Sequence, residues 1–160
     1  MTHPLARAKH NASINPQLNP SINPKVTAAI NPVFNPWINP GRNSKIDPKF
    51  KKSLNPLLDP SLNPTSNPLL DPKRTRKFSG LRRRSPDAEL LGYVVRTANK
   101  AVLLFFDRDL NWTAYAVDNS QEGYNVFDLE GKWKGYVLKN RAGGWNEFNL
   151  DGDWTGFIAA

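Results

Sequence analysis

The sequence predicts an all-β C-terminal domain, in which four β-hairpin repeats close into a shallow pseudo-fourfold barrel, preceded by a non-helical Asn-Pro repeat segment. A repeat of 21 residues predicts the hairpins, because Phe106, Phe127 and Phe148 are equally spaced. Units this short cannot bury an apolar face alone, so the copies must stack or close into a ring. Thirteen of the 17 aromatic residues follow residue 85, which places the core in the C-terminal half.

The chain starts with residues 1–10, which we expect to be a flexible N-terminus, followed by a tetrad repeat at residues 11–72. Fourteen of the sixteen register positions from Asn11 to Asp71 are Asn or Asp, mostly followed by Pro and preceded by an apolar residue. Each Pro inside an α-helix would destabilise the helix by about 3 kcal/mol. A Pro at most fourth positions therefore excludes an α-helix here. Asn or Asp before Pro favours type I turns. Two interpretations stay open, a rod or solenoid edge of regular turns and a semi-stiff linker.

Residues 73–85 form a basic segment that we interpret as a hinge. Residues 1–84 carry a net charge of +12 and residues 85–160 a net charge of −4, so any polyanion would contact the N-terminal part. An anionic membrane or nucleic-acid phosphates could both be bound in this way, without sequence recognition, and a solvated linker is the third interpretation. The candidate polyanion-binding residues are Lys73, Arg74, Arg76, Lys77, Arg82, Arg83 and Arg84.

Residues 86–160 have the pattern of β-hairpins. Each unit has two strands rich in β-branched and aromatic residues, joined by Asx and Gly residues such as those of Asp128–Lys132 and Asn149–Asp153. A fourth unit starts at LLGYVV, where Leu90 takes the Trp position. The repeat aromatic residues are candidates for hairpin packing or, alternatively, for a ligand platform: Trp112, Trp133, Trp154, Tyr93, Tyr115, Tyr136 and Phe157.

Small residues precede four of these aromatic residues, at Gly92, Ala114, Gly135 and Gly156. They would let strands approach closely where a ring of hairpins narrows. Closure with fourfold pseudo-symmetry also removes the exposed edges that an open stack would leave. We therefore expect a closed barrel.

These Gly-Tyr, Ala-Tyr and Gly-Phe steps, with the spacing of Phe-Asp or Phe-Asn before Trp, resemble the fourfold β-flower family. The resemblance covers just under half of the chain and implies four hairpins around a short barrel, with a looser likeness to tubby-type barrels that contact membrane phosphoinositides. The first unit departs from the pattern by lacking both Phe and Trp. GGWNEFNLDGDWTGF is also similar to choline-binding cell-wall repeats, which cage quaternary ammonium groups. MORN-like repeats are a further alternative.

Nothing in the sequence indicates an enzyme. There is no Cys, and the two His residues, His3 and His10, lie in the N-terminal extension. The carboxylates at Asp107, Asp128 and Asp151 stand where hairpin turns favour Asx residues. A calcium loop that starts at Asn149 would require a Gly at its sixth position and a distal bidentate Glu, and the sequence has neither there. We therefore expect no catalytic residues, no metal and no cofactor.

The sequence predicts an attachment module that binds an anionic membrane surface, or a lipid-like or peptide ligand. The alternative is a self-assembling scaffold built on the tetrad repeat, and the third possibility is a choline-binding-like module. Partners would then be a lipid surface, a protein or a second copy; we do not expect specific nucleic-acid recognition. The N-terminus has too few successive apolar residues for a signal peptide, so we expect a cytoplasmic protein, with peripheral membrane attachment as the alternative.

Overall fold

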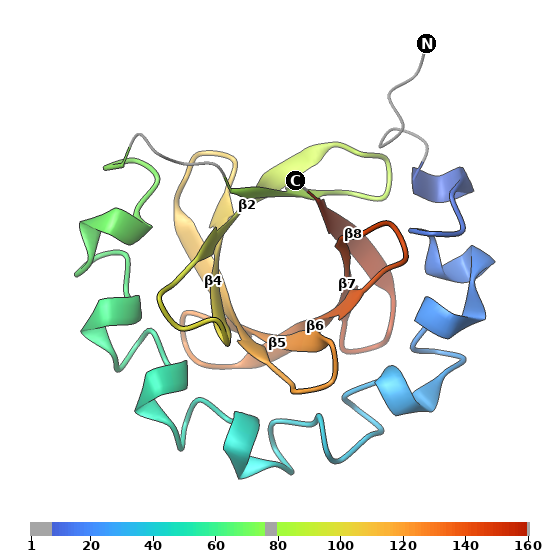
Figure 1. The fold of residues 1–160 in the computed structure, drawn as a ribbon, viewed down its shortest axis with the longest axis horizontal. Helices are drawn as coiled ribbons and strands as arrows, with labels where there is room; N and C mark the ends of the chain where they lie inside the picture. Colours follow the sequence, from blue (N-terminus) through green and yellow to red (C-terminus); the bar gives the residue numbers. More distant parts are fainter. Residues whose placement is uncertain (1–7, 76–79, 160) are drawn as a thin grey trace.

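The C-terminal half is a closed antiparallel barrel of eight strands in a computed structural model that describes residues 8–75 and 80–159. Strands adjacent in sequence are adjacent in the barrel, and β1 pairs with β8 to close it (Figure 1). The expected all-β barrel of hairpins is confirmed. The strands are β1 (Leu81–Arg84), β2 (Leu90–Arg96), β3 (Val102–Asp107), β4 (Trp112–Asp118), β5 (Gly123–Asp128), β6 (Trp133–Lys139), β7 (Trp145–Asn149) and β8 (Trp154–Ala159).

The 21-residue repeat builds the same turn in three hairpins. Asp107, Asp128 and Asn149 each start a turn, and each side chain accepts hydrogen bonds from the backbone N–H groups two and four residues later. Gly131 and Gly152 adopt left-handed φ angles of 84° and 82° at equivalent turn positions. The turn chemistry that the sequence indicated therefore fixes the hairpin register.

Close strand approach explains the small residues before the aromatic positions. A Cβ atom on Gly92 would stand 1.9 Å from the carbonyl oxygen of Phe106, and one on Gly135 would stand 2.3 Å from that of Phe148. Neither contact is possible between real atoms. The pairing also shifts register between Phe105 and Phe106 and at the equivalent steps of β5 and β7, as β-bulges do.

The barrel begins before the boundary at residue 86 that the sequence indicates. Leu81–Arg84, which the sequence analysis assigns to the basic hinge, forms β1 and pairs with both β2 and β8. Three consecutive Arg residues do not suggest a strand. The strand is possible because alternate residues point to opposite faces, so that Leu81 and Arg83 face the interior.

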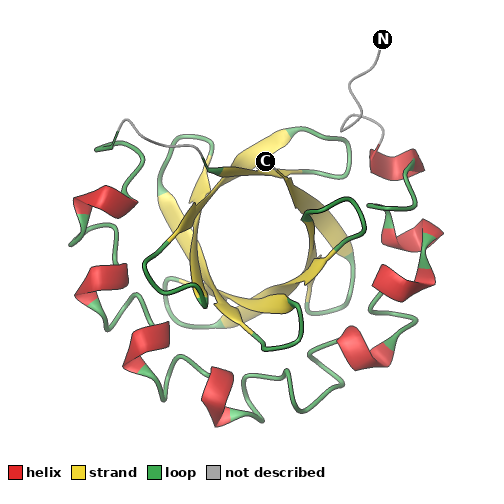
Figure 2. Ribbon diagram, viewed as in Figure 1, coloured by secondary structure: helices red, strands yellow, loops and turns green. Residues whose placement is uncertain are grey.

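The tetrad segment is a chain of tight turns that curves around the outside of the barrel (Figures 1 and 2). We call residues 11–75 the belt. Its described residues contain no α-helix, as expected. Some turns are 3-10 helices: η2 (Pro16–Leu18), η3 (Pro20–Ile22), η4 (Ala28–Ile30), η5 (Ser44–Ile46), η6 (Lys52–Leu54), η7 (Pro60–Leu62) and η8 (Pro68–Leu70). Because the belt packs along the barrel, it is neither a straight rod nor a semi-stiff linker.

Asn side chains stabilise the belt in two ways. The Oδ1 atom of Asn35 accepts from the backbone N–H of Trp37, two residues later, and its Nδ2 donates to the carbonyl of Ala29. Asn15, Asn43, Asn55 and Asn67 repeat both bonds. Thr27 lacks the first bond and keeps an equivalent of the second through its hydroxyl. An amide serves both purposes because it carries a donor and an acceptor.

A period of eight residues lies within the tetrads. Every second apolar residue faces the barrel, and together these form the inner row: Ile14, Ile22, Ile30, Ile38, Ile46, Leu54, Leu62 and Leu70. The residues halfway between them form the outer row: Leu18, Val26, Phe34, Arg42, Phe50, Leu58 and Ser66. Ile38 is 1% exposed, whereas Phe50 is 73% exposed. Successive tetrads therefore point in opposite directions.

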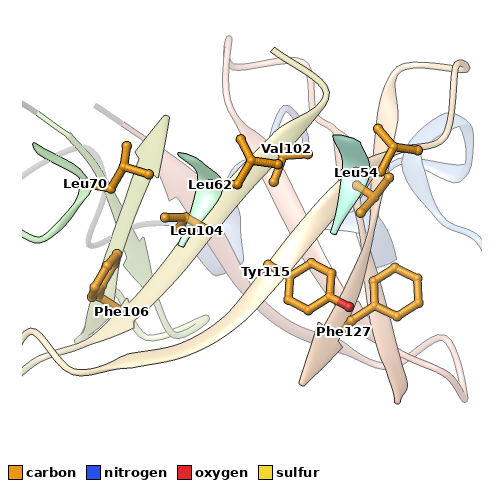
Figure 3. Packing of buried hydrophobic residues seen from close by; sticks show 9 residues of the cluster. Leu54, Leu62, Leu70, Val102, Leu104, Phe106, Tyr115 and Phe127 are labelled. Atoms are coloured by element: carbon orange, nitrogen blue, oxygen red, sulfur yellow. The ribbon is translucent and has the colours of Figure 1, made fainter. Parts of the chain in front are cut away.

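The barrel consequently has two apolar faces. Leu103, Phe105 and Val137 belong to a cluster in the interior. On the outside, Leu54, Leu62 and Leu70 of the belt cover Val102, Leu104, Phe106, Tyr115, Val117 and Phe127 (Figure 3). The belt is thus the outer layer of the hydrophobic core.

Buried Asn side chains of the barrel hold the belt at fixed points. Asn146 on β7 donates to the carbonyl of Ile14, and Asn125 on β5 donates to the carbonyl of Ile38 over 3.0 Å. Both residues are buried and stand 21 residues apart, at one position of the hairpin repeat. Asn99 adds a bond of 2.7 Å to the carbonyl of Ser53. These bonds give the belt carbonyl groups of Ile14, Ile38 and Ser53 a partner on the barrel.

Candidate functional sites

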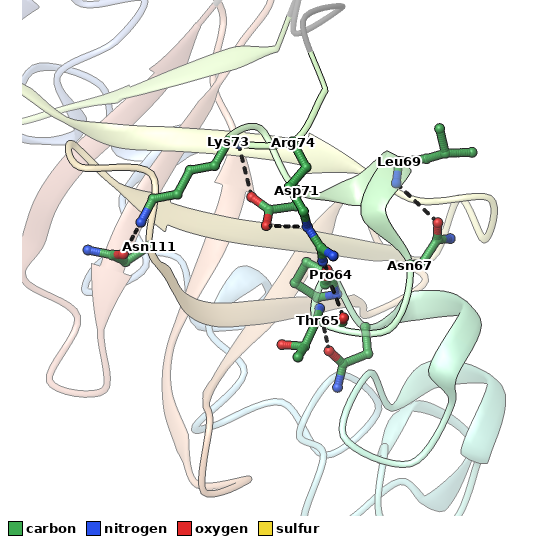
Figure 4. A network of polar contacts seen from close by, with 9 residues as sticks. Pro64, Thr65, Asn67, Leu69, Asp71, Lys73, Arg74 and Asn111 are labelled. Atoms are coloured by element: carbon green, nitrogen blue, oxygen red, sulfur yellow. Dashed lines mark hydrogen bonds and ion pairs between the residues drawn. The ribbon is translucent and has the colours of Figure 1, made fainter.

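The basic residues at the end of the belt contact the fold itself (Figure 4). Lys73 donates to the side-chain oxygen of Asn111 over 2.6 Å. Arg74 pairs with Asp71 over 3.0 Å and also donates to the carbonyl of Pro64. Arg76 and Lys77 lie outside the described residues. This end of the candidate hinge therefore anchors the belt to the turn between β3 and β4.

The Arg residues of β1 do not share one surface. Arg83 points into the barrel, where its Nε lies 2.8 Å from Oε1 of Glu147. Arg84 donates to the carbonyl of Ala88, and Arg82 is exposed. Whether these residues bind a polyanion stays a prediction, but their side chains do not form one continuous patch.

The repeat aromatic residues lie between the barrel and the belt. Tyr115, Tyr136 and Phe157 are fully buried, and Tyr93, Trp112, Trp133 and Trp154 are half-buried. Tyr115 stacks on Phe127 and Tyr136 on Phe148, with ring centroids 5.4 and 5.5 Å apart. The indole N–H groups of Trp112 and Trp133 donate to carbonyls two residues later. These contacts are those of packing residues rather than of an open aromatic cage.

Two of these tyrosines carry buried hydroxyl groups without a partner among the described residues, Tyr115 and Tyr136. Desolvation raises the pKa of Tyr115 to about 12, and Asp128 and Asp47 add smaller electrostatic effects. Desolvation also raises the pKa of Tyr136, with a further contribution from Asp153. Both hydroxyls therefore stay protonated at neutral pH.

The barrel interior is filled along its middle, and cavities lie at its two ends. We call the end with the β2–β3, β4–β5 and β6–β7 turns mouth A, and the opposite end mouth B. Val94, Leu103, Ala116 and Ile158 belong to the cluster between them. Side chains fill the interior of an eight-stranded barrel in this way when no ligand space is kept. The central opening of the ribbon in Figure 2 is thus occupied by side chains.

Mouth B contains an ion pair that breaks the repeat. Arg83, Phe105, Val126 and Glu147 occupy equivalent positions on β1, β3, β5 and β7. The Glu147 side chain is 8% exposed, and the Arg83 guanidinium lies 4.8 Å from the centre of the Phe105 ring. A cavity of about 180 Å³ opens beside this pair, with Thr113, Lys134 and Thr155 in its lining. Two ionic groups thus replace apolar residues in one layer of the core.

Mouth A holds a larger cavity, of about 360 Å³. Its lining includes Arg96, Lys100, Leu103 and Tyr124. The Tyr124 ring meets Trp145 edge-on, with centroids 5.3 Å apart. Desolvation and then Asp118 raise the pKa of Tyr124, and Arg96 acts in the opposite direction. The cavity therefore combines cationic groups with an aromatic wall.

A run of exposed basic residues lies on the belt, outside the predicted hinge. Five basic residues are exposed between residues 42 and 52: Arg42, Lys45, Lys49, Lys51 and Lys52. None of them forms an ion pair with another residue of the described ranges. Phe50 lies within this stretch and is 73% exposed, and Phe34 and Trp37, which precede it in the belt, are 69% and 73% exposed. We call these eight residues the belt patch.

No family model, curated protein or solved structure matches this chain. Within residues 8–75 and 80–159, no group of three or more His, Cys, Asp or Glu side chains is arranged to hold a metal ion. The same residues include no helix that is long and apolar enough to cross a membrane.

The belt patch could have been found from the period of eight. Inner-row positions hold only Ile or Leu and are followed two residues later by Pro without exception, whereas outer-row positions vary from Phe to Arg and Ser. Constancy at one set of positions and variation at the other is the sign of one buried and one exposed face.

Proposed function

We propose that this protein is a non-enzymatic attachment module that adsorbs to an anionic membrane surface through the belt patch. The observation that supports the proposal is the combination of five exposed basic residues, without an ion pair to another described residue, with three exposed aromatic side chains between residues 34 and 52 of the belt. Monomeric proteins rarely expose large apolar side chains together unless the surface has a partner.

The chemistry of the belt patch suits a lipid headgroup region. Each Lys or Arg near an anionic leaflet contributes about 1 kcal/mol of electrostatic attraction, which salt screens. Trp37 can lie at the interface, where its amphipathic ring is favoured, and the two Phe rings can enter the boundary with the acyl chains. Because the belt is curved, its middle can touch a flat surface while its ends point away (Figure 2).

The resemblance to the β-flower family is compatible with this proposal, through the looser likeness to barrels that contact phosphoinositides. A choline-binding role has less support, because Trp112 and Trp133 are half-buried and their indole N–H groups are bonded within their own strands. Caging of a quaternary ammonium group requires accessible aromatic faces.

Co-sedimentation of the full chain with vesicles tests the proposal. The vesicles are phosphatidylcholine alone or mixed with phosphatidylserine, at low and high salt. We expect binding to the anionic vesicles at low salt and its loss at high salt. Replacing the five basic residues of the belt patch by Gln should abolish binding.

A matched variant controls for net charge. It replaces five exposed basic residues of the barrel by Gln: Arg108, Lys132, Lys134, Lys139 and Arg141. This variant should still bind. Equal losses of vesicle binding in both variants would mean that only overall charge matters, and would overturn the assignment to the belt patch. Absence of vesicle binding by the unmodified chain would overturn it as well.

A self-assembling scaffold is a second candidate, because exposed apolar residues continue along the belt from Leu18 to Leu69. Light scattering of the full chain over a range of concentrations distinguishes the two functions. Assembly would be supported by a mass that grows with concentration and stops growing in a variant with Phe34→Ser, Trp37→Ser and Phe50→Ser. A constant monomer mass would overturn it.

A further inference from the structure

Some polar side chains around mouth A form hydrogen bonds within the fold, and others form none with the described residues. Thr97 and Asn99 are used: the Thr97 hydroxyl donates to backbone carbonyls of its own turn, and the Asn99 amide donates to Ser53 of the belt. Arg96, Lys100 and the Tyr124 hydroxyl form no side-chain hydrogen bond or ion pair with the other described residues.

These three unused groups are all donors, and they converge on one cavity. Arg96 ends β2 and Lys100 lies in the following turn, while Tyr124 enters from β5 across the barrel. A guanidinium beside an ammonium binds an oxyanion through charge-assisted hydrogen bonds. The nearby Asp118 does not cancel both charges, and its Oδ1 already accepts from the backbone N–H of Ser120 over 2.7 Å.

Apart from Thr97 and Asn99, the rest of the cavity lining is apolar or aromatic. Leu103 lies in its lining, and Tyr124 with its edge contact to Trp145 forms an aromatic wall. The volume of about 360 Å³ is within the range of small-ligand sites, whereas the cavity of about 180 Å³ at mouth B is below it. A few convergent polar groups in an apolar pocket are the usual arrangement of a small-molecule site.

We infer that mouth A binds a small organic anion with a flat apolar body, a carboxylate or a phosphate monoester, whose charged group lies between Arg96 and Lys100 and whose ring packs against Tyr124. This site is separate from the belt patch. It gives the barrel a function of its own in small-molecule binding.

Titration of the full chain with phenyl phosphate and with benzoate tests the inference. Binding is measured by calorimetry and by the indole N–H resonance of Trp145, assigned with Trp145→Phe. At least one of the two should bind saturably and shift this resonance, and the tighter one identifies the charged group. Benzyl alcohol, which lacks the charge, and inorganic phosphate, which lacks the ring, should each bind at least about tenfold more weakly.

Substitutions locate the site. Arg96→Gln and Lys100→Gln should each weaken binding by about tenfold or more, because each removes a charge-assisted hydrogen bond. Tyr124→Leu should remove most of the discrimination between phenyl phosphate and inorganic phosphate. Lys139→Gln is the matched control, since Lys139 ends β6 as Arg96 ends β2 but is absent from the lining of this cavity.

The results separate this site from general anion binding. An unchanged affinity in Arg96→Gln and Lys100→Gln, or an equal loss in Lys139→Gln, would overturn the inference. So would a loss of phenyl phosphate binding on neutralising the belt patch, or the absence of saturable binding by either anion. Vesicle binding in Arg96→Gln should be that of the unmodified chain, so the two proposals can fail independently.

Discussion

Asn146, buried on β7, donates a hydrogen bond of 2.6 Å from Nδ2 to the carbonyl oxygen of Ile14, 132 residues earlier in the belt. The equivalent position on β3 is Leu104, which is apolar and buried. Asn146→Leu therefore fits the repeat but leaves the Ile14 carbonyl without this partner. We expect a loss of about 1–3 kcal/mol in the free energy of unfolding, measured in urea. A variant as stable as the unmodified chain would show that this bond does not anchor the belt.

Because inner and outer rows alternate, we expect substitutions only four residues apart to differ strongly in their cost in stability. Ile46 is 4% exposed and Phe50 is 73% exposed. Ile46→Ala should cost about 2–5 kcal/mol, because it leaves a cavity between belt and barrel. Phe50→Ala should change the stability by less than about 0.5 kcal/mol. Equal costs in urea denaturation would contradict the assignment of the two faces.

The ion pair of Arg83 and Glu147 predicts a non-additive double substitution. Glu147→Val copies Val126, the equivalent residue of β5, but leaves Arg83 without its partner inside the barrel. We expect a cost of about 3–5 kcal/mol for this variant and recovery of most of it when Arg83→Leu is added. Urea denaturation of both single variants and the double variant completes the cycle. Additive costs would mean that the two charges do not interact.

The turn carboxylates predict a loss of stability in acid. Hydrogen bonds from the backbone N–H groups of Asn111 and Lys132 are the largest causes that lower the pKa values of Asp107 and Asp128, respectively. A lowered pKa stabilises the fold above the unfolded-state value of about 3.9, and this contribution is lost as the pH falls through the folded-state value. Asp107→Asn with Asp128→Asn copies the natural Asn149. Thermal denaturation of this variant should depend less on pH below about 4, and an unchanged dependence would exclude these turns as its source.

From the raised pKa of Tyr115 we expect the protein to lose stability at alkaline pH. Its pKa is raised to about 12 by desolvation, so its contribution is complete below the unfolded-state value of about 10 and is lost as the pH rises through about 12. Phe157 occupies the equivalent position of β8, so Tyr115→Phe should be accommodated. We expect it to be neutral or stabilising by up to about 1 kcal/mol at neutral pH, with a smaller alkaline loss in urea denaturation. A clear destabilisation at neutral pH would instead indicate a hydrogen-bonded hydroxyl.

The barrel could be predicted because its repeat carries the geometry directly. Gly92 and Gly135 mark strand approaches that tolerate no Cβ atom, and Asp128 and Asn149 mark turns that need an Asx side chain. The strand of Arg82 and Arg83 could not be predicted, because its charge pattern is that of a solvated linker. Only closure of the barrel, which places Glu147 beside Arg83, explains an Arg at an interior position.

The belt and the two mouths show different limits of sequence reasoning. The local turn chemistry does not show which way each tetrad faces, since the turns at Asn35 and Asn39 have the same hydrogen bonds although Phe34 and Ile38 face opposite ways. In the sequence, only the constant Ile or Leu at every second tetrad indicates the buried face. Arg96 and Tyr124 are likewise unrelated in sequence, and they share a cavity because β2 and β5 belong to the same ring.

The covering of the barrel by the belt also has a consequence for biosynthesis. During translation the belt leaves the ribosome before the barrel, so its inner row has nothing to pack against until the barrel strands follow, and Ile14 must wait for Phe157 on β8. The nascent chain therefore exposes eight Ile and Leu side chains while more than half of its length is still being added. Folding must await these distant contacts, which is slow and favours aggregation. We expect chaperones that hold extended apolar segments to determine the yield of this protein.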